Sequence, residues 1–211
     1  MEWSSIVGPL AAVGVFIIMR LLMRKKKQGG EIAEVENREE FQQHLHTANV
    51  EASLVKKGDD REKIGLGRAS GQRSEGIIKL EDKHLDSINI VGISSQTGTH
   101  YFTDYLVKSP NIMGKRIPKK TTLVKKKSPP IVGQVVGIEW KGDAALAQSL
   151  NLDYSLEDKL LRASINDNFN GNIWIYPEPK HGYTRIRIDY LLPSTDLFGA
   201  ISTIAKCIKS W

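Results

Sequence analysis

The side chains best suited to acid–base or metal chemistry are five histidines, one cysteine and scattered carboxylates. His44 and His46 are two residues apart in a predicted helix, so they point to different faces and do not form a ligand pair. The sequence has none of the short cysteine and histidine spacings that hold zinc. We therefore expect no metal and no cofactor.

Two polar loops could still bring acid–base groups together. The loop at 166–172 partly matches a calcium-binding loop, but Asn166 occupies its first position and Pro177 its twelfth, where carboxylates are required. An ordinary turn explains it better, because Asn and Gly tolerate positive φ. The loop at 177–182 contains Glu178 and His181, which with His100 could serve a small membrane-associated enzyme. A solvated turn explains this loop equally well.

No nucleophile or phosphate-binding motif supports catalysis. Cys207 lies beside the apolar stripe of a predicted final helix, where inert packing is expected, and there is no G-x-S-x-G pattern. The glycines near Arg68 are not followed by the lysine–serine pair of a nucleotide-binding loop. These observations favour a protein that is not an enzyme.

A basic stretch offers a different chemistry. It has seven cations and no acid: Lys115, Arg116, Lys119, Lys120, Lys125, Lys126 and Lys127. Beside a membrane, anionic lipid headgroups would attract it by about 1 kcal/mol per residue. An acidic protein or a merely solvated loop are the alternatives, and nucleic acid is unlikely because the stretch has no aromatic residue on which bases could stack. We expect 109–130 to be a mobile insertion between strands.

Residues 3–23 predict a transmembrane helix. They contain a single charge, Arg20, and a helix of this length spans roughly 30 Å, the thickness of the bilayer's hydrocarbon core. A cleaved signal peptide or a buried helix fits less well, because basic residues follow the apolar run and it has no polar face. Those residues, Arg24, Lys25, Lys26 and Lys27, predict a cell-membrane protein with its N-terminus outside, its C-terminal domain cytoplasmic, and headgroup contacts at this point.

Residues 24–76 are expected to connect the anchor to the folded domain. After the basic juxtamembrane residues, an amphipathic helix is predicted over 31–57, with Phe41, Leu45, Ala48, Ala52 and Val55 at heptad spacing. This helix either lies on the domain or supports weak self-association. The Gly- and Ser-rich segment 65–76 then predicts a flexible linker.

The alternating apolar pattern of 77–211, with helical segments between its strands, predicts a soluble α+β domain. Strands are expected at 88–93, 101–107, 132–140, 172–176 and 183–190, and helices at 144–150, from 155, and after Pro193. The resulting order, β-β-β-α-β-β-α, predicts a mostly antiparallel sheet with helices on one face. With the anchor and the basic stretch, it favours a membrane-tethered binding or scaffold module with an unknown protein partner.

Overall fold

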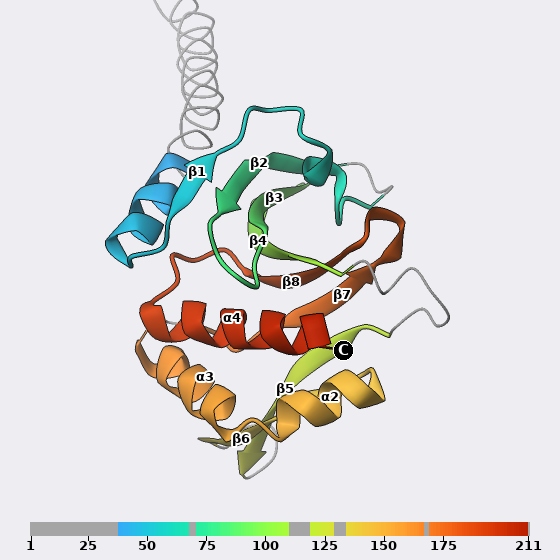
Figure 1. The fold of residues 1–211 in the computed structure, drawn as a ribbon. Coiled ribbons are helices and arrows are strands. Elements are labelled where there is room, and N and C mark those ends of the chain that lie inside the picture. The colour runs from blue at the N-terminus through green and yellow to red at the C-terminus, as the bar shows by residue number, and fades with distance from the viewer. Residues whose placement is uncertain (1–37, 68–70, 110–118, 129–133, 167–168, 211) are drawn as a thin grey trace, which may run out of the picture.

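The computed structural model describes residues 38–67, 71–109, 119–128, 134–166 and 169–210. They form an α+β domain with an antiparallel sheet of eight strands, shown in Figure 1. The predicted anchor at 3–23 and the basic residues at 24–27 lie outside these ranges. Within them, no helix is long and apolar enough to cross a membrane.

The sheet has the strand order β1-β2-β3-β4-β8-β7-β5-β6, so that β1 and β6 form its two edges. Every neighbouring pair is antiparallel. The strands are β1 (Ala52–Leu54), β2 (Gln72–Leu80), β3 (Ser87–Ser95), β4 (Gly98–Lys108), β5 (Thr121–Ser128), β6 (Gln134–Lys141), β7 (Trp174–Glu178) and β8 (Tyr183–Asp189).

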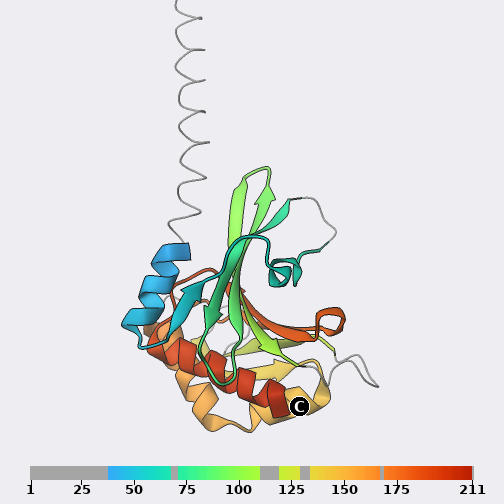
Figure 2. The same cartoon turned by 45° about the horizontal axis from the view of Figure 1, so that its top comes forward.

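The α-helices all contribute to one core on one side of the sheet, as predicted. They are the helix at 38–47, α2 (Ala144–Asn151), α3 (Tyr154–Asn166) and α4 (Thr195–Ser210), and Figure 2 shows α2 to α4 below the sheet. The side chain of Asp143 caps α2 by accepting from the backbone N–H groups of Ala145 and Leu146. Ile201 of α4 and Phe41 of the first helix are fully buried in the same core as Tyr105 and Ile186 of the sheet.

The opposite side of the sheet, here called the helix-free face, carries the alternate residues. On β8, Ile186 and Ile188 point into the core while Arg185, Arg187 and Asp189 point away, which is the alternation predicted from the sequence. Strand register aligns one row of residues across six strands of this face: Asn89, Asp104, Arg187, Trp174, Thr122 and Lys141.

Residues 58–67 cover part of the helix-free face. They include the short 3-10 helix η1 (Asp60–Lys63), whose Arg61 and Glu62 carbonyls accept from the Asn89 side chain. Ile64 is 2% exposed. Buried with it on this face, and outside the main core, are Ile77, Val91 and Leu106. The segment therefore closes a second, smaller apolar cluster.

The predicted linker at 65–76 is wrong in its last part, because β2 begins at Gln72 and pairs with β3. The glycine and serine content hid this strand. Gly76 lies at a register shift in β2 and has φ +134°, a conformation that favours glycine. The sheet therefore begins well before Ile77.

The continuous helix predicted over 31–57 is also wrong. The helix ends at Thr47, and Asn49 follows with φ 58°, the left-handed conformation that commonly ends helices. Ala52 lies in β1 instead. Phe41 and Leu45 are fully buried in the core, so this seam is not free for self-association.

The prediction of an insertion through 109–130 is wrong for 121–128, which form strand β5 between β7 and β6. The strand was missed because three consecutive lysines obscure its alternating pattern, in which Thr121 and Leu123 are buried. With β1, β2 and β5 added, the order becomes β-β-β-β-β-β-α-α-β-β-α after the first helix.

Candidate binding face

Two arginines and two carboxylates, here called the arginine cluster, lie at the centre of the helix-free face. Arg187 donates from Nε and Nη2 to the two oxygens of Asp104, at 2.6 and 2.7 Å. Arg185 donates from Nε to Glu178 at 2.7 Å and lies 3.5 Å from Asp104. Burial alone would lower the pKa of Arg187, but its bonds to Asp104 outweigh burial and raise that pKa. The Arg187 guanidinium is thus held in its charged form.

Aromatic rings surround this cluster. The Arg185 guanidinium lies 4.1 Å from the ring centroid of Tyr176, and Lys120 Nζ lies 4.9 Å from the same centroid. Arg187 lies 5.0 Å from the ring of Phe102. Trp174 meets that ring edge-on, at 6.3 Å between centroids. Cation–π contacts of this kind fix the rings and the cations in place.

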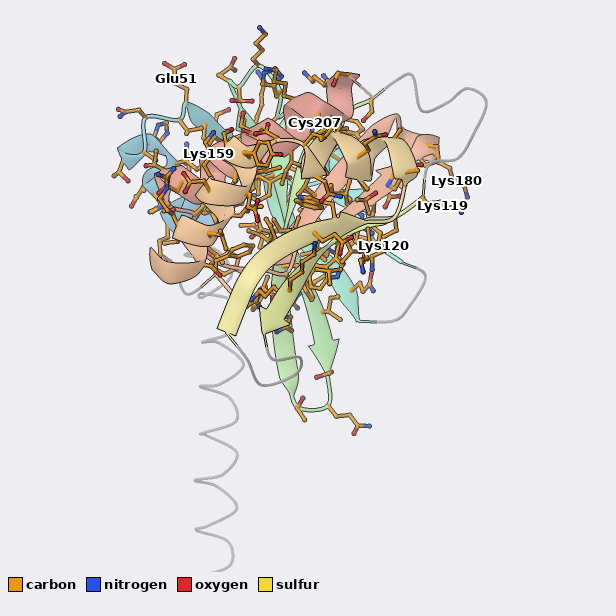
Figure 3. The ribbon with its side chains drawn as sticks, turned by 90° about the horizontal axis from the view of Figure 1, so that it is seen from below. Glu51, Lys119, Lys120, Lys159, Lys180 and Cys207 are labelled. Atoms are coloured by element: carbon orange, nitrogen blue, oxygen red, sulfur yellow. The ribbon has the colours of Figure 1, made fainter. Side chains whose placement is uncertain are left out.

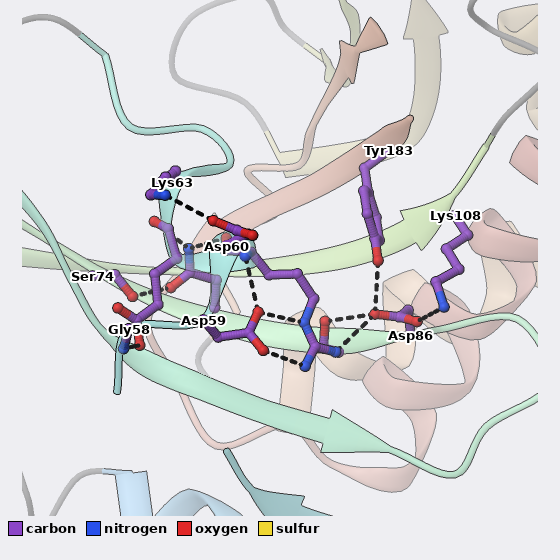
Figure 4. A network of polar contacts seen from close by, with 12 residues as sticks. Gly58, Asp59, Asp60, Lys63, Ser74, Asp86, Lys108 and Tyr183 are labelled. Carbon is purple, nitrogen blue, oxygen red and sulfur yellow. Dashed lines mark hydrogen bonds and ion pairs between the residues drawn. The ribbon is translucent and has the colours of Figure 1, made fainter. Parts of the chain in front are cut away.

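A second polar cluster fastens residues 58–67 to the sheet (Figure 4). The Asp86 carboxylate accepts from Arg61, Lys108 and Tyr183, at 3.1, 2.9 and 3.3 Å. Burial raises the pKa of Asp86, but hydrogen bonds from Lys108, Arg61 and Ser87 outweigh burial and lower it.

Two other groups of this cluster, Tyr183 and Asp59, also have shifted pKa values. Burial and the charge of Asp86 raise the pKa of Tyr183 to about 12, so its hydroxyl stays a donor. Asp59 accepts two bonds from the Arg61 side chain, which lower the pKa of Asp59 to about 2. This cluster therefore holds its charged groups in fixed pairs between residues 58–67 and the sheet.

A third cluster lies at the other end of β8. Asp189 accepts from His100 at 3.2 Å and from Asn172 at 3.2 Å, and Asn170 also donates to it. Burial raises the pKa of Asp189, but these bonds from Asn170, Asn172 and His100 lower it overall. The two asparagines come from the loop at 166–172, which the sequence singled out.

The groups suggested for acid–base catalysis do not come together. Glu178 pairs with Tyr183 at the start of β8, whereas His100 binds Asp189 at its end. Six residues of strand separate these points by roughly 20 Å. His181 is exposed in η3 (Pro179–His181), the short helix that follows Glu178. In the described ranges, no three His, Cys, Asp or Glu residues lie close enough to hold a metal ion.

The structure also divides the basic stretch. Lys115 and Arg116 lie outside the described residues. Lys126 is exposed on the helix-free face near Glu139, at 3.8 Å, whereas the neighbouring Lys125 points to the other side and lies over Gly171. Lys127 follows in β5. Strand alternation therefore places the Lys125 and Lys126 side chains on opposite sides of the sheet, so these two do not act as a single patch.

Three exposed lysines gather at another edge and are here called the rim lysines: Lys119, Lys120 and Lys180. Figure 3 shows them toward one edge of the body, away from Lys159 on α3. Their ammonium groups form no ion pair with the residues that the structure describes, although the backbone N–H of Lys119 donates to the Asp143 carboxylate at 3.5 Å. Sequence reasoning missed Lys180 because it comes from a different hairpin.

Sequence reasoning also missed the aromatic part of this face. Trp174 and Tyr176 occupy alternate positions of β7, a spacing that could have placed both on one face. Cys207 is half-buried on α4 against the core, as expected of a packing residue. Comparison with protein-family models, curated proteins and solved structures finds no match to this chain.

Proposed function

We propose that this chain is a single-pass membrane-anchored protein whose cytoplasmic α+β domain is a binding module. The anchor is the apolar segment 3–23, and the cations at 24–27 hold its C-terminal end in the cytoplasm, where they contact anionic headgroups. The observation that carries the anchor is a run of 21 residues interrupted by one charge.

The binding role is supported by the state of the ionisable groups on the helix-free face. Asp104, Glu178 and Asp86 each bind an arginine or a lysine, which fixes the position of the carboxylate. Fixed ion pairs orient a surface for recognition, whereas a general acid or base must be able to change its protonation state. The rim lysines add positive charge, because their ammonium groups form no ion pair with the described residues, and this suits an anionic ligand.

The packing of the first helix suits this arrangement. Phe41 and Leu45 of the helix at 38–47 are buried in the main core, so an anchor that precedes this helix would hold the folded domain near the inner surface of the membrane. The partner would then be met close to that surface.

Extraction and protease protection test the anchor and its orientation. The full chain should stay in the membrane fraction in alkaline carbonate, and protease added outside sealed cells should leave residues 38–210 intact. Replacing Arg24, Lys25, Lys26 and Lys27 with Gln should produce a fraction of chains that external protease digests. Release by carbonate, or digestion of the unaltered chain, would refute the proposal.

A further inference from the structure

The exposed part of the helix-free face combines aromatic rings with cations from several strands. Phe102 of β4 and Trp174 and Tyr176 of β7 are each partly exposed, and register places them on either side of Arg187 and Arg185. Along the chain these rings are far from the basic stretch, but β5 pairs with β7 in the sheet. The stacking surface that the basic stretch itself lacks is therefore supplied by neighbouring strands.

The cations of this area outnumber its free anions. Lys126 and Lys141 share a single acidic partner, Glu139, at 3.8 and 3.4 Å. The rim lysines add three charges at one edge, and Lys120 lies over the ring of Tyr176. Of the acidic groups near the rings, Asp104 is paired with Arg187, and Asp189 accepts hydrogen bonds from His100 and Asn172.

We infer that this part of the helix-free face, from β4 to β6, binds single-stranded RNA. Aromatic rings on an open sheet stack on bases of any sequence, and the surrounding lysines follow the phosphates. The inference deepens the proposed function by naming the partner. It rests on the proposed function for the choice of RNA over DNA, because the domain is placed in the cytoplasm.

The shape of the domain favours a flexible strand over a flat bilayer at this surface. The β3–β4 hairpin stands out beyond the rest of the described body in Figures 2 and 3. Its exposed tip, 94–99, contains only Ser, Gln, Thr and Gly. A bilayer approaching from that side would meet this polar tip before it reached β7, whereas a single strand can pass beside it.

The test uses the full chain in mild detergent and a labelled oligouridine of about 12 nucleotides, a length suited to one sheet surface. Fluorescence anisotropy should show binding that weakens with salt. Replacing the three rim lysines with Gln should weaken binding at least about tenfold, and the slope of log affinity against log salt should fall by about 0.7 for each phosphate that is no longer neutralised. Lys206→Gln removes an exposed charge from α4, on the other side, and should leave binding unchanged.

A second measurement tests stacking directly. Oligouridine containing 5-iodouracil should crosslink on irradiation to Trp174, Tyr176 or Phe102, and Trp174→Ala should weaken affinity about tenfold if its melting temperature is unchanged. No binding of oligouridine would overturn the inference, and so would crosslinks confined to other surfaces. Equal binding of heparin with no effect of Trp174→Ala, or preference for anionic vesicles or oligothymidine, would also overturn it. Carbonate extraction reports on the anchor separately, so the two failures are distinguishable.

Discussion

Arg187 and Asp104 form a bidentate ion pair at the centre of the sheet, with Asp104 completely buried. Arg187→Met would leave the Asp104 carboxylate with only the longer contact to Arg185, at 3.5 Å. We expect a loss of about 3–5 kcal/mol in the free energy of unfolding, because a buried charge without its partner is costly. Urea denaturation at neutral pH measures this loss.

The control for this pair removes both charges. Arg187→Met combined with Asp104→Leu should be less destabilised than Arg187→Met alone, since apolar replacements of a buried ion pair are often tolerated. A double variant as unstable as the single one would contradict this account.

Gly65 tests whether residues 58–67 cover the arginine cluster. A Cβ at this position, where φ is +79°, would lie 2.6 Å from Arg185 Nε. Gly182 has a similar φ of +69° but has no atom within 4 Å of its Cβ position. Gly182→Ala should therefore lower the free energy of unfolding only by the strain of a left-handed backbone at a residue with a side chain, about 1–2 kcal/mol. Gly65→Ala should cost measurably more in the same thermal melts, and equal costs would show that the segment lies off the sheet.

Asn151 protects the edge of the sheet at β6. Its side chain accepts from the Trp140 N–H at 2.8 Å and donates to the Trp140 carbonyl at 3.1 Å. Asn151→Ala should lower stability by about 1–2 kcal/mol and speed amide exchange at Trp140. Asn151→Asp retains the acceptor and should protect the amide better than Ala does. Unchanged exchange in Asn151→Ala would disprove the role.

Acid stability should depend on Asp59. Its pKa falls from 3.8 to about 2 on folding, chiefly because of the Arg61 side chain. A lowered folded pKa means that the stabilisation is complete well above the unfolded pKa of 3.8 and is lost as the pH falls through the folded pKa of about 2. Asp59→Asn should therefore be less stable at neutral pH and lose less further stability across that window. Asp60→Asn is the control, because the Asp60–Lys63 ion pair is highly exposed and contributes little.

The sequence was sufficient to predict a strand or helix where hydrophobic spacing and capping residues agreed. The alternation of Ile186 and Ile188 with the arginines predicted β8 and its two faces, and the apolar stripe of α4 predicted a buried helix. It failed at β2 and β5, where glycines or lysines dominate strands whose formation depends on neighbours distant in sequence. Strand propensity is weak against such context.

The binding face could not be assembled from sequence because its parts come from separate hairpins. Tyr176 and Lys120 meet through the pairing of β5 with β7, two strands that are not consecutive along the chain. The pairing of Arg185 with Glu178 likewise depends on the β7–β8 register. The alternation of buried and exposed residues is a pattern within one strand, whereas these contacts join strands that the sequence alone does not show to be neighbours.

Burial of Phe41 has a consequence for how far the domain could reach. With the first helix fixed in the core from Arg38, only residues 24–37 would separate the folded body from the proposed anchor. Fully stretched, those 14 residues span at most about 50 Å. Such a short tether would restrict the protein to capturing what diffuses along the membrane surface, at high local concentration, and would exclude partners deeper in the cell.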